Sequence, residues 1–508
     1  MSTRSSEDLT FPRRLLIEQG GPGHRGPELP RCDVPVTPIA ELLGGVALRD
    51  TLAFPEVSEP EVVRHFIELS TLNHHIDRGF YPLGSCTMKY NPKINDEIAG
   101  LAGFALAHPL GPDAANQGAL RVIFELQKVL ATITGFAAVT TQPSAGAQGE
   151  MTGLMLIRAY HRSRGEGEIR SKVLVPDSAH GTNPASVNLL GWETVTIASD
   201  ERAGVDLQAL TRALDSNTAA VMLTVPNTIG QFERNILEVT RRAHAVGAQV
   251  YMDGANLNAL VGLVRPADLG FDVMHINVHK TFSTPHGGGG PGAGPVAVAK
   301  HLEPFLPIPI VVERDGGYAL VHDRPQSIGR VHAFHGNFGI LARALTYILT
   351  LGPEGLMRVS RTAILNANWL MRRLANSYEL PHDEHCMHEF VLSGRPLRKH
   401  GVKTLDIAKR LLDFGVHAPT VYFPLIIEEA LMIEPTETET LDRLEHFALA
   451  MERIAREASE HPETLKLAPH DTPVSRLDEG RAARELILKW RTSPGTPPVP
   501  AAETAARR

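Results

Sequence analysis

The sequence predicts an α/β protein with a mainly parallel sheet, followed by a smaller mixed α/β domain. Between residues 137 and 300, short apolar or β-branched runs alternate with amphipathic helical segments. This alternation is typical of strand–helix–strand units in a parallel sheet with helices on both faces. A long helical pattern at 335–375 and a further apolar region at 377–491 come after it, and they predict the second domain.

The expected elements follow from local patterns. Strands are expected at 173–175, 194–197, 221–225, 249–252, 274–276 and 295–298. Helices are expected at 60–72, 117–133, 154–161, 207–214 and 237–245. Since ligands bind at the carboxyl ends of strands in open α/β sheets, candidate functional residues are sought in the loops that follow these strands.

Four segments are expected along the chain. An N-terminal extension and arm at 1–90 precedes a large ligand-binding domain at 91–335. A helical connection and small domain at 336–491 come next. The last segment, TSPGTPPVPAAETAARR (492–508), is rich in Pro, Ala and polar residues, and this composition predicts a disordered tail.

Composition excludes several functional classes. The 508 residues are 43% hydrophobic and 21% charged, with a net charge of −7, so no basic field indicates a nucleic-acid partner. Apolar runs are too short to span a membrane, and no secretory signal is visible at residues 1–14. The cysteines Cys32, Cys86 and Cys386 lie far apart, so neither a disulfide framework nor a zinc knuckle is expected. We therefore expect a cytoplasmic enzyme without a metal site.

A small-residue loop, QPSAGAQGE (142–150), opens directly into a helical pattern. Free backbone amides of Gly146, Ala147 and Gln148 at a helix start would suit a phosphate group. The loop lacks both the Gly-Lys-Ser/Thr ending of nucleotide-binding loops and the GxGxxG spacing. An ordinary helix-capping turn is the alternative interpretation.

Two polar residues follow expected strands. His180, in the loop VPDSAHGTNPAS (175–186), could stack on a planar ligand or transfer a proton; alternatively, it is an ordinary surface histidine. Asp253 ends an apolar strand, where a carboxylate is costly unless it pairs with a cation such as a protonated heterocyclic nitrogen. Its alternative is a carboxylate that caps the turn before Gly254.

The fourth candidate is Lys280, which follows the apolar run at 274–276 and precedes four glycines, Gly287–Gly290. A lysine at a strand end beside a glycine-rich turn is placed to form a Schiff base; a solvated lysine on a surface turn is the alternative. Asp253 and Lys280 are separated by about one strand–helix–strand unit. Together the four candidates match what pyridoxal phosphate needs: a lysine, an acid for the ring nitrogen, a ring-stacking residue and a phosphate site.

Two further clusters leave alternatives open. The segment PHDEHCMHE (381–389) contains His382, His385, Cys386 and His388, but this spacing fits no common zinc pattern. Cys86 could be a reactive thiol whose pKa is lowered by Lys89, or an inert loop cysteine.

Several sequence motifs of the chain are typical of one protein family. They are FYPLGSCTMKYNPKIN (80–95), GAQGE (146–150), DSAHGTNPAS (177–186), MDGAN (252–256), HKTFSTPHGGGGPGAGPVAV (279–298), MHEFV (387–391) and PTVYFPLIIEEALMIEPTETE (419–439). In these motifs the chain closely resembles glycine decarboxylase, the P-protein of the glycine cleavage system, over about 450 residues. At 508 residues it is similar to subunit 2, the β chain of the split bacterial form, which carries the cofactor lysine.

The resemblance implies roles for individual residues. The implied fold is that of type I, aspartate aminotransferase-like, pyridoxal-phosphate enzymes, with a seven-stranded large-domain sheet. Lys280 would form the Schiff base, Asp253 would contact the pyridine nitrogen and His180 would stack on the ring. The remaining implied cofactor-binding residues are Gly146, Ala147, Gln148, Asn256 and His279. The general acid among His180, His279 and His286 stays open.

The resemblance also implies an activity and partners. Glycine would be decarboxylated, and the aminomethyl group would pass to the lipoyl arm of the H-protein. The expected partners are the companion subunit 1 (α chain), in an α2β2 assembly, and lipoylated H-protein. Two alternatives remain: another type I pyridoxal-phosphate enzyme, such as an amino-acid decarboxylase or a cysteine desulfurase, and a non-catalytic scaffold half of a complex.

Overall fold

The computed structural model describes residues 14–48, 54–286 and 292–489. The chain divides into two compact units, one formed by residues 1–74 with 477–508 and the other by residues 75–476. In the first unit, the described helices include α1 (Ile39–Leu42), α2 (Glu59–Ser70) and α15 (Glu479–Arg484). The expected tail at 492–508 and the glycines at 287–290 lie outside the described residues.

The second unit contains a seven-stranded sheet with the order β1-β7-β6-β5-β4-β2-β3. The strands are β1 (Ala138–Thr140), β2 (Lys172–Pro176), β3 (Glu193–Ile197), β4 (Thr218–Thr224), β5 (Gln249–Gly254), β6 (Val273–Ile276) and β7 (Val296–Val298). Neighbours from β3 to β6 pair in parallel, whereas β7 is antiparallel to both β6 and β1. The predicted mainly parallel sheet is confirmed.

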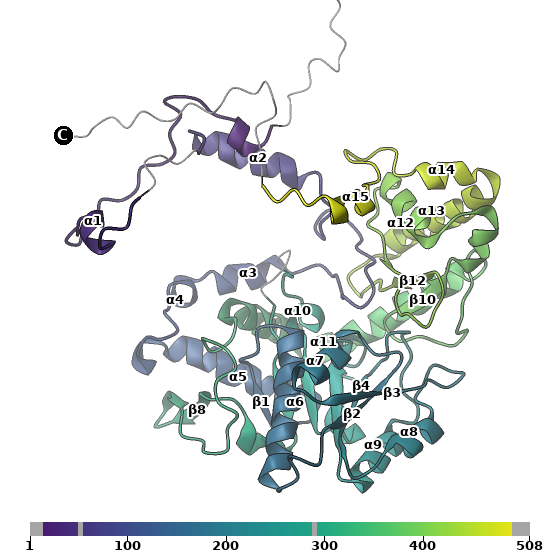
Figure 1. Cartoon of the computed structure of the whole chain (residues 1–508), viewed down its shortest axis with the longest axis horizontal. Helices are drawn as coiled ribbons and strands as arrows, with labels where there is room; N and C mark the ends of the chain where they lie inside the picture. The colour runs from purple at the N-terminus through teal and green to yellow at the C-terminus, as the bar shows by residue number, and fades with distance from the viewer. Residues whose placement is uncertain (1–13, 49–53, 287–291, 490–508) are drawn as a thin grey trace, which may run out of the picture. The chain divides into compact units, whose positions relative to one another are not determined.

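Helices cover both faces of this sheet (Figure 1). Residues of α6 (Gly146–Ser163) and α7 (Thr182–Leu189) contribute to one hydrophobic core. Residues of α5 (Gln117–Thr134), α8 (Leu207–Ala213) and α9 (Ile236–Ala245) contribute to the other. The central strands are buried along their whole length, because both of their faces are covered.

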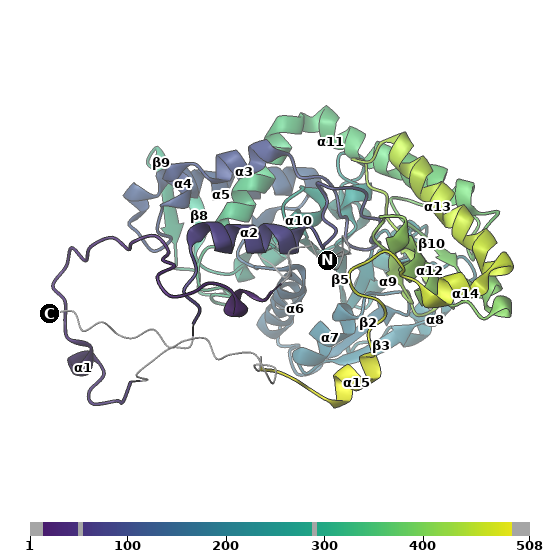
Figure 2. The same ribbon diagram turned by 90° about the horizontal axis from the view of Figure 1, so that it is seen from above.

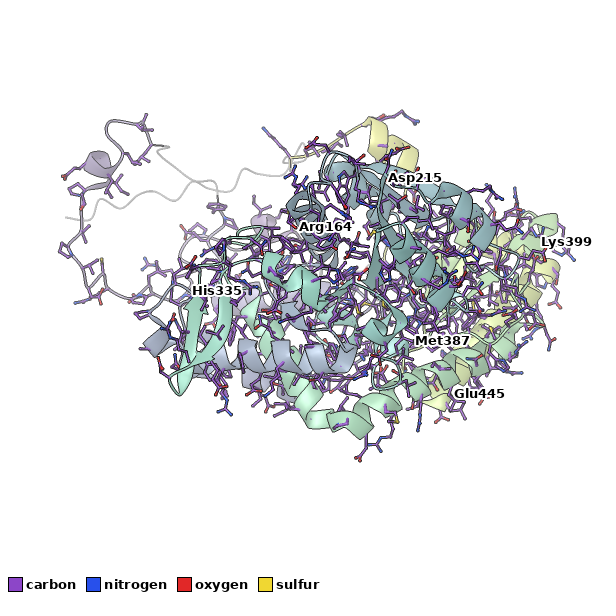
Figure 3. All side chains as sticks on the ribbon, turned by 90° about the horizontal axis from the view of Figure 1, so that it is seen from below. Arg164, Asp215, His335, Met387, Lys399 and Glu445 are labelled. Carbon is purple, nitrogen blue, oxygen red and sulfur yellow. The ribbon has the colours of Figure 1, made fainter. Side chains whose placement is uncertain are left out.

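Short elements flank the sheet. Helices α3 (Lys93–Ala99) and α4 (Ala102–Ala105) precede α5, and α10 (Val278–Thr281) follows β6. A hairpin of β8 (Ile310–Arg314) and β9 (Gly317–Val321) follows β7. His335, labelled in Figure 3, contacts the carbonyl oxygen of Pro109 through its Nε2 atom at 3.2 Å.

A single long helix, α11 (Phe338–Leu374), leads from the large sheet to a smaller α/β region. Its course is interrupted at Gly352, whose φ of 62° and ψ of −177° are not helical and which precedes Pro353. Residues on both sides of this break, from Ile340 to Val359, pack in the core of the large sheet, whereas residues from Ala367 to Leu374 pack in the core of the smaller region. The helix therefore passes from one core to the other between Val359 and Ala367, after the break.

The smaller region is a three-stranded antiparallel sheet with the order β10-β12-β11, formed by β10 (Phe390–Ser393), β11 (Thr420–Val421) and β12 (Ala430–Ile433). Helices α12 (Thr404–Asp413), α13 (Leu441–Glu460) and α14 (Pro462–Leu467) accompany it, and α13 packs beside the end of α11 (Figure 2). The predicted α/β class with a smaller C-terminal α/β part is confirmed, whereas the exact boundaries at 90, 335 and 491 stay predictions.

Phe447 on α13 provides a test of the smaller core. Its side chain is fully buried, and its ring meets that of Phe80 edge-on at 5.1 Å. We expect Phe447→Ala to lower the free energy of unfolding by about 3–5 kcal/mol, since it removes apolar contacts and leaves a cavity. Leu449→Ala, on the exposed side of the same helix, is expected to change it by less than about 0.5 kcal/mol. Equal effects in urea unfolding would contradict this packing.

Candidate active site

Lys280 and Asp253 lie at the carboxyl ends of neighbouring parallel strands. Asp253 is in β5, paired in register with His275 of β6, and Lys280 is in the short helix α10 that follows β6. The Lys280 ammonium donates a hydrogen bond to the carbonyl oxygen of Ser85 at 2.7 Å. The sheet thus brings together the lysine and the acid that the sequence singled out.

Asp253 is held in its ionised form by donors on three sides. Its Oδ2 atom accepts a hydrogen bond from the Asn183 side chain at 3.0 Å, and Oδ1 accepts one from the Ala255 amide at 2.9 Å. His275 Nε2 lies 3.2 Å from Oδ1. Burial acts to raise the pKa of Asp253, but His275, these hydrogen bonds and the nearby Lys280 outweigh it and leave that pKa below its ordinary value.

A second contact fixes the ring of His275. The Tyr251 hydroxyl lies 2.8 Å from His275 Nδ1, and both side chains are almost completely buried. Since β5 and β6 are adjacent, Tyr251, Asp253 and His275 form a continuous polar row within an otherwise apolar sheet. Such a row orients the Asp253 carboxylate and holds it at the strand end.

Helix α6 begins at Gly146, next to the Lys280 segment. The first three amides of a helix, here those of Gly146, Ala147 and Gln148, have no acceptor within the helix. A Cβ atom at Gly146 would lie 2.4 Å from Asn277 Oδ1, so glycine is what allows this close approach. The Gln148 side chain accepts from Ser144 and donates to the Val331 carbonyl, which leaves the backbone as the anion-binding feature.

His180 lies in the loop between β2 and α7 and is partly buried. Its Nδ1 atom lies 2.8 Å from Thr182 Oγ1, and the Thr182 hydroxyl donates to Glu150 Oε1 at 2.7 Å. The Thr182 amide also donates to His180 Nδ1, at 3.3 Å, so Thr182 contacts this ring nitrogen through both its hydroxyl and its backbone. The edge of the ring also meets Phe423, at a centroid distance of 5.6 Å.

Two further sequence candidates lie near Lys280. Asn256 donates to the carbonyl oxygen of Pro226 and, at 3.2 Å, to Glu389 Oε1. His279 accepts from the Ala293 amide and meets the ring of His286 at 5.1 Å. Burial, with His286 and Lys280, lowers the pKa of His279 to about 3, and burial with Lys280 lowers that of His286 to about 4. Both rings are therefore neutral at physiological pH.

A loop from the N-terminal part of the second unit completes the surroundings of Lys280. Ser85 and Thr87 have positive φ values of 63° and 47°, which are unfavourable for residues other than glycine. The Ser85 amide donates to Glu389 Oε2 at 2.7 Å, and the Thr87 amide donates to Glu434 Oε2 at 2.8 Å. These two carboxyl groups of the smaller region therefore hold the loop that carries the carbonyl bound to Lys280.

Lys89 follows this loop and is completely buried. Its ammonium group contacts Glu437 Oε1 at 2.7 Å, Asn258 Oδ1 at 2.9 Å and the Thr281 carbonyl at 2.8 Å. Burial acts to lower the pKa of Lys89, but Glu437 and Tyr347 outweigh it, so the pKa is raised and the group stays charged. Lys89 thereby fixes the backbone immediately after Lys280.

The surroundings of Cys86 bear on the two alternatives that the sequence left open. Burial raises the pKa of the Cys86 thiol, and the cation that acts in the opposite direction is Lys280, because Lys89 is engaged by Glu437. The thiol is therefore protonated at neutral pH. This agrees with the alternative of a thiol that is not activated.

The histidines and the cysteine of the segment 381–389 are not grouped together in the described part of the chain. Cys386 is buried, and burial raises its thiol pKa to about 12. Within the described ranges, His388 groups with Glu389 and Glu434 rather than with His382, His385 or Cys386. Met387, labelled in Figure 3, precedes His388 and Glu389, and its backbone amide donates a hydrogen bond to the Gly230 carbonyl at 2.7 Å.

Several residues of the site were not identified from sequence as site residues: Ser85, Lys89, Asn183, Glu150, His275, Glu389, Glu434 and Glu437. Some lie in motifs that carried the resemblance, such as LGSCTMK and MHEFV, but no local pattern indicated what they contact. Asn183 and Glu150 lie in helices that follow the ends of strands. This position was the signal in the sequence that could have indicated them as site residues.

The fold and the strand-end lysine and aspartate define a chain with the architecture of type I pyridoxal-phosphate enzymes. A glycine decarboxylase (P-protein) of the glycine cleavage system, solved with an inhibitor, superposes with a TM-score of 0.67 at 20% identity, covering 80% of this chain and 91% of that one. A NifS-like protein superposes with a TM-score of 0.58 at 14% identity, covering 74% and 99%. At these identities the likeness concerns the fold.

Sequence comparison identifies the family. The family model described as "Glycine cleavage system P-protein" matches residues 45–414, and that described as "Glycine dehydrogenase, C-terminal domain" matches residues 359–476. The chain therefore belongs to the glycine cleavage system P-protein family. Proteins named probable glycine dehydrogenase (decarboxylating) subunit 2 are 57% identical in Halalkalibacterium halodurans, covering 94% of this chain and 98% of that protein, and 54% identical in Chloroherpeton thalassium, covering 94% and 97%.

The buried pair of Lys89 and Glu437 gives a test of the site's framework. We expect Lys89→Met to lower the free energy of unfolding by about 3–5 kcal/mol, because it leaves the Glu437 carboxylate buried without its cation. Lys93→Met breaks an exposed pair with Asp77 in the same segment and is expected to cost less than about 1 kcal/mol. Denaturant unfolding of both variants measures this difference, and equal costs would argue against a buried, charged Lys89.

Proposed function

We propose that this protein is the cofactor-bearing subunit 2 of a two-chain glycine decarboxylase. It would release CO2 from glycine and pass the aminomethyl group to the lipoyl arm of the H-protein. One observation carries the proposal: in a chain of this family, Lys280 and an ionised Asp253 meet at the carboxyl ends of β5 and β6, beside the open start of α6. The relatives named above support the substrate and the subunit assignment.

The residues present fit pyridoxal 5′-phosphate. Lys280 has the amine for covalent attachment, Asp253 has the anionic oxygen for a ring nitrogen, and the first amides of α6 can receive a phosphate. Within the described residues, the buried Oδ1 atoms of Asn183 and Asn277 have no hydrogen-bond partner, which is in keeping with a polar ligand here. When bound, this cofactor supplies a ring that accepts the electron pair left by the departing CO2.

The chain's own residues have distinct tasks in this proposal. Asp253, held ionised by His275 and Asn183, keeps a proton on the ring nitrogen. His180, whose Nδ1 is engaged by Thr182, offers its face to the ring and its Nε2 to the substrate. Asn256 and His279 line the site, and the low pKa of His279 makes it a hydrogen-bonding group rather than an acid.

The proposed partners are subunit 1 in an α2β2 assembly, and lipoylated H-protein. Helix α2 supports a partner surface, because its apolar residues Val63, Phe66 and Ile67 are about half exposed.

The three cysteines are free, in keeping with a cytoplasmic, reducing location. Among the described helices, each is too short or too polar to cross a membrane.

The alternative of a cysteine desulfurase is disfavoured by the two cysteines that lie in the same compact unit as Lys280. Such an enzyme needs a mobile, reactive thiol, whereas Cys386 is buried with a pKa of about 12 and Cys86 is protonated in its loop. A scaffold without catalysis is disfavoured by the assembled Lys280 and Asp253. Glycine therefore remains the substrate that the relatives named above support.

Lys280→Ala tests the proposal directly. The protein is purified with subunit 1 and supplied with pyridoxal phosphate, and the visible absorbance of the bound cofactor is recorded with the exchange of labelled CO2 into glycine in the presence of lipoylated H-protein. We expect both signals to fall to background in Lys280→Ala, because the covalent attachment is gone, and to persist in Lys300→Ala, whose side chain is exposed. Exchange retained by Lys280→Ala would overturn the proposal.

Asp253→Asn separates cofactor binding from chemistry. We expect the bound-cofactor absorbance to remain, since Lys280 is intact, while CO2 exchange falls by about a hundredfold or more, because a buried charge that supports the ring nitrogen is lost. Asp272→Asn, which removes a carboxylate bonded to His244 and the Val250 amide, is the control on the same sheet. Equal loss in both variants would point to damage to the sheet rather than to the proposed role.

A further inference from the structure

Glu389 and Glu434 form a carboxyl pair that the proposed function does not use. Both side chains have no exposed surface, and one oxygen of each lies within 4.8 Å of the other and of a ring nitrogen of His388. They enter from the ends of β10 and β12, which are paired in register at Phe390 and Ile433. The pair lies against the loop whose Ser85 carbonyl binds Lys280.

The charges around this pair do not balance if both carboxyl groups are ionised. Burial together with Lys280 lowers the pKa of His388 to about 3, so the ring is neutral, and the Cys86 thiol is protonated. Glu437 is already paired with Lys89. Among the described residues that interact with the pair, Lys280 is thus the one cation. It would have to offset two negative charges if Glu389 and Glu434 were both ionised.

Hydrogen bonding indicates where a proton can reside. Three of the four carboxyl oxygens accept from N–H groups: Glu389 Oε2 from Ser85, Glu389 Oε1 from Asn256 and Glu434 Oε2 from Thr87. The fourth, Glu434 Oε1, has no hydrogen-bond partner in the described part of the chain and lies 3.8 Å from His388 Nε2, which has none there either. A proton on Oε1 would displace no hydrogen bond, because this oxygen accepts from no N–H group in the described part of the chain.

We propose that Glu389 and Glu434 share one proton, carried on Glu434 Oε1, so that the pair holds a single negative charge beside Lys280. When the Lys280 ammonium becomes neutral, as covalent attachment requires, its N–H electron pair stays on Nζ and the released proton adds to Glu389 to form an O–H bond. One positive and one negative charge disappear together, so the carboxyl pair and Lys280 keep a combined charge of zero. This second step rests on the proposed function, whereas the sharing of the proton does not.

Burial raises the pKa of both carboxyl groups, with a further contribution from Glu434 for Glu389 and from Glu437 for Glu434, in agreement with a pair that retains a proton at neutral pH. The sharing also explains the placement of the loop. A singly charged pair can accept from two amides without the repulsion of two carboxylates. Ser85 and Thr87 thereby keep the unfavourable left-handed backbone that presents the Ser85 carbonyl to Lys280.

Infrared difference spectroscopy of the full chain at neutral pH tests the sharing. The wild type is expected to show the carbonyl band of one protonated carboxyl group that is lost in Glu434→Gln and also in Glu389→Gln, since Glu434 ionises once its charged neighbour is removed. Glu233→Gln, which alters a buried carboxyl bonded to the Val205 and Asn235 amides, should retain that band. A band lost in Glu434→Gln alone, or absent from the wild type, would overturn the sharing.

Metal analysis of the same wild-type preparation gives a check that needs no variant. An equimolar divalent cation lost from Glu389→Gln would mean that His388, Glu389 and Glu434 bind a metal in place of the proton, and it would overturn the proposal. A metal-free protein with the shared band supports it.

The charge exchange with Lys280 needs a separate readout. Labelling of Lys280 by pyridoxal and borohydride, quantified by peptide mass spectrometry, is measured against pH. In Glu389→Gln/Glu434→Gln the midpoint should move to lower pH by roughly one unit or more, because the ammonium loses its counter-charge. An unchanged midpoint would overturn the exchange. Absence of labelling in every protein would instead contradict the proposed function and leave the infrared result standing.

Discussion

The site depends on one constraint: several charged groups must coexist where water is excluded. Asp253 remains ionised because His275, Asn183 and the Ala255 amide surround it, and Lys89 remains charged because Glu437 contacts it. Each compensation comes from a different segment of the chain. The mutual placement of the large sheet, the loop at 84–88 and the smaller region is therefore an electrostatic requirement as well as a matter of apolar packing.

Much of the fold could be predicted from sequence, because alternation of apolar runs and amphipathic helices reports on burial directly. The expected strands at 221–225 and 249–252 correspond to β4 and β5, which are buried on both faces. Lys280 and Asp253 could be singled out because a charged residue directly after a buried strand conflicts with the local pattern. The antiparallel direction of β7 carried no such local signal, since pairing direction is set by the connection.

The rest of the site could not be predicted because its chemistry arises from contacts rather than from residue type. Glu389 and Glu434 resemble ordinary glutamates until the sheet of the smaller region places them together. The sequence left open whether Lys89 activates the Cys86 thiol, because only the structure shows that the Lys89 ammonium contacts Glu437. His275 was a strand residue without a visible partner until the register of β5 and β6 set it against Asp253.

The loop at 84–88 also has a consequence for how the protein is made. Its hydrogen bonds to Glu389 and Glu434 join residues that are 304 and 347 positions apart. During synthesis the ribosome must release most of the chain before Ser85 and Thr87 can find these acceptors. Local helices form early, whereas contacts of such sequence separation form late. The hydrogen bonds that hold this loop can therefore form only after β10 and β12 have been synthesised, so the surroundings of Lys280 are completed late.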